Sequence, residues 1–310
     1  MTATGTSGPA TLVVGAGGFL GGAVRRAAGH RSDVHVARVP WDDEDAAVDG
    51  LVSAIREVRT PDAPWRIVWC AGTGVVATGS EVFDAEQRLI ARVLEATAED
   101  AAAPGTLFFA SSAGAVYAGC SGAPFSEDTE PAPLAPYGRA KLQAEERFRA
   151  WSTATGARLL VGRFSNLYGP GANLGKAQGL VSQLALAHLE GRPSSIYVPT
   201  ETTRDYLYID DAAAMVLDAL DVVDQAVPGT VVTKIFASGR SATISEVVTA
   251  VEHAFGERLD VRDGVDPSAT FQGLDLRFAS HVLPGVDARD HTDFGQGVRN
   301  TVEALRTARA

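Results

Sequence analysis

The segment Thr11-Leu-Val-Val-Gly15-Ala-Gly17-Gly18-Phe-Leu-Gly21 decides the fold of this chain of 310 residues. An apolar run leads into glycines at positions i, i+3 and i+6, and a helical pattern follows. Gly15 permits a tight turn, Gly18 lets the backbone approach a pyrophosphate, and Gly21 lets the helix pack on the strand. The alternative is an ordinary glycine-rich loop. The segment predicts a phosphate-binding turn at a helix N-terminus, with candidate contacts at Gly15, Gly17, Gly18, Phe19, Leu20 and Gly21.

The first half of the chain alternates apolar, strand-like runs with helical patterns, which indicates βαβ units and a parallel sheet. Strands are predicted at residues 12–14, 34–37, 67–70, 107–109 and 159–163. Helices are predicted at residues 21–29, 46–58, 82–98 and 138–151. We therefore expect an α/β fold with a doubly wound parallel sheet, a Rossmann domain that binds a dinucleotide, over residues 1–168.

The pattern changes after Gly169, where the alternation weakens and Pro and Gly interrupt the chain more often. Shorter helices are predicted at residues 179–190 and 244–255. We expect a smaller C-terminal α/β lobe over residues 169–310, which would bind the substrate. Residues 206–220 look like a strand end that passes into a helix, and we expect them to return to the first domain.

Composition excludes several classes of function. The chain carries 27 Lys and Arg against 38 Asp and Glu, so it has no general basic surface for nucleic acid. Two cysteines, Cys70 and Cys120, are too few for a disulfide framework, and the His residues show no metal-ligand spacing. Residues 1–9 lack a signal-peptide pattern, and no apolar run is long enough to span a membrane. We expect a cytoplasmic protein with no structural metal and neither nucleic acid nor membrane as a partner.

The end of the second predicted strand departs from the usual pattern of an NAD site. A carboxylate there normally accepts hydrogen bonds from the adenosine ribose, but this chain has Val36-Ala37-Arg38. The guanidinium of Arg38 suits the 2′-phosphate of NADP, which a carboxylate would repel. NADP is therefore the expected cofactor, and NAD is the alternative if Arg38 points to solvent. Ala71 and Gly72, after the third predicted strand, are further candidate cofactor contacts.

A phenol and an ammonium share one face of the helix predicted at residues 138–151 and the turn before it. They belong to Tyr137 and Lys141, which are four residues apart. A nearby ammonium stabilises the phenolate, so Tyr137 could act as an acid or a base nearer neutral pH. Ser111 and Ser112 follow the strand at residues 107–109, and a hydroxyl there could hydrogen-bond a substrate oxygen. The alternative is a serine pair that only turns the chain.

Five motifs, in order along the chain, resemble the extended short-chain dehydrogenase/reductase family, which contains nucleotide-sugar 4-epimerases, 4,6-dehydratases and 4-keto-sugar reductases. The resemblance covers nearly the whole chain, and the motifs together are specific for the family but not for one reaction. The motifs are Gly15-x-x-Gly18-x-x-Gly21, Ser111-Ser-Ala-Gly-Ala-Val-Tyr117, Tyr137-x-x-x-Lys141, Arg163-Phe-Ser-Asn-Leu-Tyr-Gly-Pro170 and Arg204-Asp-Tyr-Leu-Tyr-Ile-Asp-Asp211.

The resemblance implies roles for individual residues. Tyr137 would be the catalytic acid or base, and Lys141 would tune it while bonding the nicotinamide ribose. The position of the catalytic Ser or Thr is ambiguous. Counted back from Tyr117 it falls on Ala113, whereas counted forward from the strand it falls on Ser112. We prefer Ser112 and keep Ser111 in reserve.

Asn166 and Arg204 fall where the family contacts the nucleotide diphosphate of its substrate. The partner implied is therefore a nucleotide-diphosphate sugar. For Arg204 the alternative is a salt bridge with Asp205 or Asp210, and for Asn166 it is an amide that caps a loop. The resemblance also implies a homodimer formed through the helices at residues 82–98 and 138–151.

The residues favour one reaction over the others. The 4,6-dehydratases carry an Asp-Glu pair directly after the catalytic Thr, but Ala113 and Gly114 stand here, so dehydration is the least expected. Arg38 favours an NADP-dependent reductase that acts on the keto group of a nucleotide-linked 4-keto-6-deoxy sugar. An NAD(P)-dependent nucleotide-sugar 4-epimerase is the alternative. A third hypothesis is an inactive dinucleotide-binding sensor.

Overall fold

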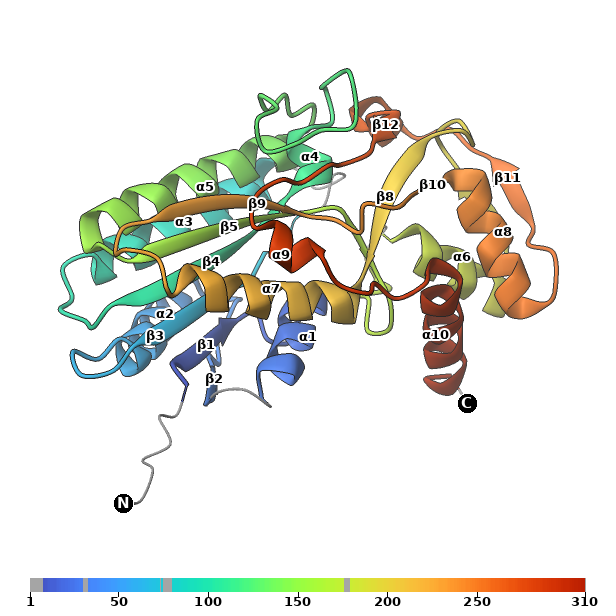
Figure 1. Ribbon diagram of the computed structural model, residues 1–310. Coiled ribbons are helices and arrows are strands. Elements are labelled where there is room, and N and C mark those ends of the chain that lie inside the picture. Colours follow the sequence, from blue (N-terminus) through green and yellow to red (C-terminus); the bar gives the residue numbers. More distant parts are fainter. Residues whose placement is uncertain (1–7, 30–32, 73, 75–79, 176–178, 310) are drawn as a thin grey trace, which may run out of the picture.

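A six-stranded parallel sheet forms the core of the chain (Figure 1). The computed structural model describes residues 8–29, 33–72, 74, 80–175 and 179–309. The strand order is β2-β1-β3-β4-β5-β9, and every neighbouring pair is parallel, so the expected doubly wound parallel sheet is confirmed. The strands are β1 (Ala10–Val14), β2 (Val34–Val36), β3 (Trp65–Trp69), β4 (Gly105–Ser112), β5 (Arg158–Phe164) and β9 (Val231–Phe236).

Helices cover both faces of this sheet (Figure 1). Successive strand residues point to opposite faces. In β1, Val13 therefore packs in the cluster under α1 and α7, whereas Leu12 and Val14 pack in the cluster under the other helices. A sheet buried on both faces needs apolar residues on both, which is why its strands read as continuous apolar runs. The helices are α1 (Phe19–Ala28) and α7 (Ile209–Val223) on one face, and α2 (Glu44–Val58), α3 (Ser80–Thr97) and α5 (Pro136–Thr155) on the other.

Much of the C-terminal part builds a second, smaller arrangement of strands and helices. Strand β8 pairs with β10, β12 and β6, while β7 pairs with β11. Tyr168, Tyr206 and Tyr208 face the helices α6, α8 and α10 in a common apolar cluster. Its elements are β6 (Asn166–Tyr168), α6 (Leu180–Leu189), β7 (Ser194–Ile196), β8 (Thr203–Tyr208), β10 (Ser241–Thr243), α8 (Ile244–Phe255), β11 (Val261–Asp263), β12 (Asp275–Leu276) and α10 (Phe294–Thr307). Short helical turns lie at Pro267–Phe271 and α9 (Pro284–Asp287), and a further one, α4 (Ala113–Val116), directly follows β4 in the first half of the chain.

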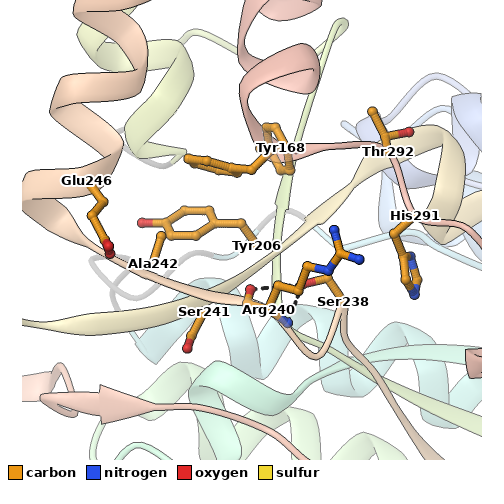
Figure 2. Close-up of a pocket in the computed structure, with 10 residues that line it drawn as sticks. Tyr168, Tyr206, Ser238, Arg240, Ser241, Ala242, Glu246, His291 and Thr292 are labelled. Carbon is orange, nitrogen blue, oxygen red and sulfur yellow. Dashed lines mark hydrogen bonds between the residues drawn. The ribbon is translucent and has the colours of Figure 1, made fainter.

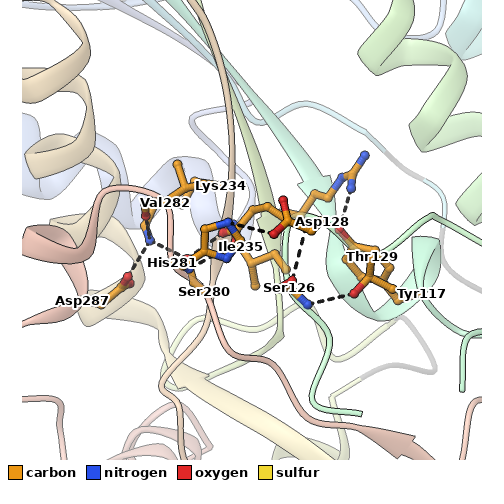
Figure 3. A network of polar contacts seen from close by, with 12 residues as sticks. Tyr117, Ser126, Asp128, Thr129, Lys234, Ile235, Ser280, His281, Val282 and Asp287 are labelled. Atoms are coloured by element: carbon orange, nitrogen blue, oxygen red, sulfur yellow. Dashed lines mark hydrogen bonds and ion pairs between the residues drawn. The ribbon is translucent and has the colours of Figure 1, made fainter. Parts of the chain in front are cut away.

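Strand β9 was not predicted from the sequence, although it forms an edge of the large sheet. Its sequence contains Lys234, which reads as a polar interruption but is completely buried. The Lys234 ammonium donates hydrogen bonds to Ser280 Oγ at 2.9 Å, to the Val282 carbonyl at 2.7 Å and to Asp287 Oδ2 at 2.7 Å (Figure 3). These partners lie some 50 residues further along the chain, so no local pattern could indicate that the charge is satisfied inside the protein.

Glu127 joins the loop after α4 to the same network. Its Oε1 accepts hydrogen bonds from the Ile235 N–H at 2.8 Å and from Ser280 Oγ at 2.6 Å, and Oε2 accepts one from the His281 N–H at 3.1 Å. Burial by itself raises the pKa of Glu127, but these hydrogen bonds outweigh it and hold the pKa below its usual value. The carboxylate therefore stabilises the fold in its ionised form.

The variant Glu127→Gln is expected to be less stable than the native chain at pH 7, by about 1–3 kcal/mol, because it leaves buried donors poorly matched. A carboxyl whose pKa is lowered by folding stabilises the folded state at pH values above its pKa in the unfolded chain, which is about 4.3 for Glu. This stabilisation is lost as the pH falls through the pKa that the group has in the folded protein. Urea unfolding of both proteins from pH 7 to about pH 3.5 should show that the difference between their free energies of unfolding becomes smaller as the pH falls. A difference that stays constant over this range would contradict the role given to the ionised carboxylate.

Among the described residues, no helix combines the length and the apolar character needed to cross a membrane. The same part of the chain holds no group of three or more His, Cys, Asp or Glu side chains that could bind a metal ion.

Candidate functional site

The glycine turn between β1 and α1 forms a cradle without side chains. The Gly18 N–H donates to the Gly15 carbonyl at 2.9 Å, and Gly15 has a φ of 85°, which favours glycine. A Cβ on Gly15 would lie 2.6 Å from the Ala71 nitrogen, and one on Gly21 would lie 2.3 Å from the Gly15 oxygen. Helix α1 has no side-chain cap and no acidic residue in its first turn. Its N-terminus can therefore offer N–H groups and positive dipole to an anion such as a pyrophosphate.

The other candidate cofactor residues lie along the carboxyl ends of neighbouring strands. Phe19 and Leu20 begin α1 and turn towards the core under it. Ala71 and Gly72 follow β3, which pairs with β1, so they stand next to the glycine turn. Arg38 follows β2 and is exposed. The strand order brings together these positions, which a dinucleotide would have to span.

Two glycines of the turn make a matched test of its packing. A Cβ on Gly21 would overlap the backbone of Gly15, whereas one on Gly17 would meet no atom within 4 Å. We expect Gly21→Ala to lower the free energy of unfolding by roughly 1–3 kcal/mol, because backbone must move to admit the methyl group. Gly17→Ala should leave it within about 0.5 kcal/mol of the native value. Thermal unfolding of the two variants without ligand measures the difference, and equal losses would contradict this account.

Tyr137 and Lys141 lie on the first two turns of α5, beside the end of β4. Helix α5 begins at Pro136, which has the backbone angle that the first turn of a helix needs. The Lys141 ammonium lies 5.8 Å from the centre of the Tyr137 ring and donates a hydrogen bond to the Ala110 carbonyl at 3.2 Å. Lys141 is only 8% exposed. The ammonium is therefore held next to the Tyr137 ring with most of its side chain shielded from solvent.

The two serines after Ala110 have different surroundings. Ser111 is buried, and its hydroxyl donates to Glu145 Oε1 at 2.6 Å. Ser112 is partly exposed and is the N-cap of α4, where its Oγ accepts a hydrogen bond from the Ala115 N–H at 3.3 Å. The proton of the Ser112 hydroxyl is not used by this contact. Of the two hydroxyls, Ser112 is thus the one that can reach a bound molecule.

Asn166 and Arg204 lie on the paired strands β6 and β8. The Asn166 Oδ1 is 3.7 Å from the position of a Cβ on Gly114, so the amide stands next to the turn that holds Ser112. Arg204 is buried, and its Nη1 donates to the Thr203 carbonyl at 2.9 Å. Burial lowers the pKa of Arg204, although nearby Tyr206 and Asp275 act in the opposite direction.

The salt bridge considered for Arg204 does not form among the described residues. Asp205 instead accepts hydrogen bonds from Ser238, through the N–H at 2.9 Å and the hydroxyl at 3.0 Å. Asp210 pairs with Arg26 at 3.6 Å. Among the residues that the structure describes, the buried guanidinium of Arg204 thus has no carboxylate at ion-pair distance.

An ion pair behind the serines was not predicted from the sequence. Arg163 Nε donates to Glu145 Oε1 at 3.0 Å, Nη2 donates to Oε2 at 2.7 Å, and Nη1 donates to the Tyr117 hydroxyl at 2.6 Å. Glu145 lies one helical turn after Lys141, and both partners of the pair are buried. The sequence shows only that Tyr137, Lys141 and Glu145 share one face of a helix. It does not indicate the ion pair, because Arg163 lies on another element, β5.

Two cavities lie away from Tyr137 and Lys141. One, of about 250 Å³, lies among α8, the start of α10 and the loop after β9, and Figure 2 shows the side chains of Tyr168, Tyr206, Arg240 and His291 around it. The other, of about 320 Å³, includes Asp205 and Arg277 in its lining. Neither is lined by Ser112, Tyr137 or Lys141.

Comparison with known proteins identifies the family that shares this arrangement. A family model described as the NAD dependent epimerase/dehydratase family matches residues 11–233. UDP-glucose 4-epimerase of Azospirillum brasilense is 33% identical over 184 residues, which is 53% of this chain and 52% of that protein. The dTDP-4-dehydro-6-deoxyglucose reductase of Escherichia coli is 28% identical over 177 residues, 56% of this chain and 54% of that protein. The chain thus spans about half the length of these curated relatives.

Solved structures share the fold over nearly the full chain. The complex of Thermus thermophilus UDP-glucose 4-epimerase with NAD superposes with a TM-score of 0.82 at 24% identity and covers 96% of this chain and 99% of that one. This likeness establishes the fold of the chain.

Proposed function

Because the chain belongs to the NAD dependent epimerase/dehydratase family, we propose that it reduces the keto group of a nucleotide-linked 4-keto-6-deoxy sugar with NADPH. The membership confirms the family that the sequence motifs indicated. The observation that carries the proposal is the placement of Tyr137 and Lys141 at the end of β4, next to Ser112. A proton donor, a buried ammonium and an accessible hydroxyl are the groups that carbonyl reduction requires.

Each of these side chains has a distinct task. The Ser112 hydroxyl donates a hydrogen bond to the keto oxygen and orients it. The Tyr137 phenol gives its proton to that oxygen as negative charge develops there. The buried Lys141 ammonium stabilises the phenolate that remains on Tyr137. When bound, the dinucleotide supplies the hydride.

The glycine cradle fits the anionic centre of a dinucleotide, since it is open at Gly17 and offers N–H groups with no acidic residue in the first turn of α1. Arg38 supports NADP, because an exposed guanidinium after β2 suits a 2′-phosphate. The cofactor contacts proposed are Gly15, Gly17, Gly18, Phe19, Leu20, Gly21, Arg38, Ala71, Gly72, Tyr137 and Lys141.

The substrate side of the proposal rests on the second strand arrangement. Arg204 and Asn166 hold the diphosphate of the nucleotide sugar, because a diphosphate can pair with the buried guanidinium, which has no carboxylate partner among the described residues. Residues 1–168 bind the dinucleotide and residues 169–310 mainly bind the substrate. Residues 206–220 belong with the first part, supported by the packing of α7 against the large sheet. Two copies of the chain pair through α3 and α5 to form a homodimer.

A nucleotide-sugar 4-epimerase is the second candidate. Its support is the Azospirillum brasilense relative, whose name gives that activity, and the NAD in the Thermus thermophilus structure. An epimerase oxidises and re-reduces the same carbon, so it consumes no cofactor. The two candidates therefore differ in the net loss of reduced dinucleotide.

The test follows the absorbance of NADPH, and separately of NADH, while the purified chain is mixed with a panel of nucleotide 4-keto-6-deoxy sugars. Stoichiometric loss of NADPH is the expected result. No net loss with either cofactor, together with interconversion of a nucleotide hexose without added cofactor, would establish the epimerase instead. Dinucleotide binding without turnover of either substrate class would overturn both and support an inactive sensor.

A further inference from the structure

The Ser111 hydroxyl is engaged inside the protein, although both neighbours of Ser111 in the chain belong to the candidate site. The carbonyl of Ala110 accepts a hydrogen bond from Lys141 Nζ at 3.2 Å. Ser112 is the N-cap of α4 and carries the accessible hydroxyl. Between them, Ser111 is buried and donates to Glu145 Oε1 at 2.6 Å. Ser111 therefore stands where it can fix both neighbours without itself reaching a bound molecule.

Glu145 connects Ser111 to the helix that carries Tyr137. It lies on α5, two turns after Tyr137 and one turn after Lys141, so the three side chains share one helix face. Glu145 is only 2% exposed. Hydrogen bonds to a carboxylate are shorter and stronger than those between neutral groups. The contact between Ser111 and Glu145 therefore sets the position of the end of β4 relative to α5.

The other end of the α4 turn is tied to the same carboxylate. Arg163 of β5 donates to Glu145 through Nε at 3.0 Å and Nη2 at 2.7 Å, and its Nη1 donates to the Tyr117 hydroxyl at 2.6 Å. Tyr117 is the C-cap of α4 and is completely buried. The turn that begins after Ser112 is thus anchored to one ion pair at both ends, through Ser111 before it and Tyr117 after it.

We infer that Ser111 is a positioning residue: its hydrogen bond to Glu145 holds the Ser112 hydroxyl where it meets the same substrate oxygen as Tyr137. Ser111 touches neither substrate nor cofactor and acts only through Ser112. Catalysis is sensitive to such placement, because a shift of about 1 Å in a reacting group can cost about 100-fold in rate. The inference rests on the proposed function, since that function gives the Ser112 hydroxyl a substrate oxygen to meet.

A double-mutant cycle tests whether Ser111 acts through its neighbour. The four proteins are the native chain, Ser111→Ala, Ser112→Ala and the variant with both substitutions. Their kcat and KM are measured with the nucleotide sugar on which the native chain is active. Ser111→Ala deletes one hydroxyl and leaves the ion pair between Glu145 and Arg163 in place. The cycle separates a residue that positions the Ser112 hydroxyl from one that only stabilises the fold.

Ser152→Ala is the matched control. Ser152 is also buried and donates one hydrogen bond, to the Ala157 carbonyl at 2.7 Å, but it lies at the end of α5 remote from Tyr137. Ser111→Ala and Ser152→Ala each delete one buried hydroxyl, so we expect their melting temperatures to fall by similar amounts. Only Ser111→Ala should lose activity, and kcat of Ser152→Ala should stay within about twofold of the native value.

We expect Ser111→Ala to lower kcat about 10- to 100-fold, while KM for the sugar changes by less than about threefold. In the Ser112→Ala background the same substitution should change kcat by less than about threefold, because the hydroxyl that it positions is absent. An equal loss in both backgrounds would overturn the inference and indicate a purely structural effect. Near-native kcat in Ser111→Ala would overturn it as well, and so would near-native kcat in Ser112→Ala, which would leave Ser111 nothing to position.

Failure of the proposed function gives a different result. A native chain that consumes no NADPH with any 4-keto sugar refutes the reductase, and the cycle then runs on the epimerase reaction, in which a hydroxyl meets the same carbon's oxygen. A native chain that is inactive in both reactions would overturn the inference together with the proposed function.

Discussion

Tyr137→Phe is expected to lower turnover about 10²- to 10⁴-fold, the range that a positioned acid or base contributes. The substitution removes only the phenolic oxygen, and the ring keeps its contact with Phe83 at 5.9 Å. The fold and the glycine cradle should therefore be unaffected. Turnover is measured with whichever nucleotide sugar the panel identifies, and dinucleotide affinity is measured in parallel by calorimetry.

The separation of turnover from binding is what makes this result informative. Lys141, which stands four residues further along α5, retains its hydrogen bond to Ala110 in the variant. Tyr137 is itself one of the proposed cofactor contacts, so dinucleotide affinity should fall, but by no more than about tenfold and far less than turnover. A variant with near-native turnover would exclude Tyr137 as the proton donor, and a variant that fails to bind dinucleotide would assign it to binding rather than to proton transfer.

Arg163→Met is expected to lower the free energy of unfolding by about 3–5 kcal/mol. Burial by itself lowers the pKa of Arg163, but the interactions with Glu145 and Tyr117 outweigh it and raise the pKa above its usual value. Removing the guanidinium leaves the Glu145 carboxylate buried, and the partners that remain to it among the described residues are the Ser111 hydroxyl at 2.6 Å and the more distant Arg149 guanidinium at 3.9 Å. Urea unfolding with a two-state fit measures the loss.

A surface pair supplies the control for this substitution. Arg56 pairs with Asp100 at 2.9 Å, and its side chain is 53% exposed, so Arg56→Met should cost far less stability than Arg163→Met. The double variant Arg163→Met with Glu145→Leu should recover part of the stability lost in Arg163→Met, because no unpaired charge is then buried. Equal effects of Arg163→Met and Arg56→Met would contradict the burial argument.

The helices and strands that were predicted correctly are those whose pattern is local. The helix predicted at residues 244–255 coincides with α8, since its apolar spacing and the capping pair Thr243 and Glu246 are close in sequence. The short strands β6, β7, β10, β11 and β12 escaped prediction because two or three residues carry no period, whereas the equally short β2 was predicted from the βαβ alternation of the first half of the chain. Strand β9 escaped it because the partners of Lys234 are remote.

The candidate site divides in the same way. Tyr137 and Lys141 are predictable because one helical turn joins them, and the glycine turn is predictable because three glycines between a strand and a helix suffice to describe it. The different surroundings of Ser111 and Ser112 are not predictable, because they depend on Glu145 from another element.

The sequence by itself determined the parallel α/β core, the anion-accepting turn and the pairing of a phenol with an ammonium, because each depends on residues within one strand, turn or helix. The tertiary structure alone decided which serine is accessible and how the charges of Arg163 and Lys234 are satisfied in the interior. Those features depend on residues that are remote in sequence, and only chain packing brings them within hydrogen-bonding distance.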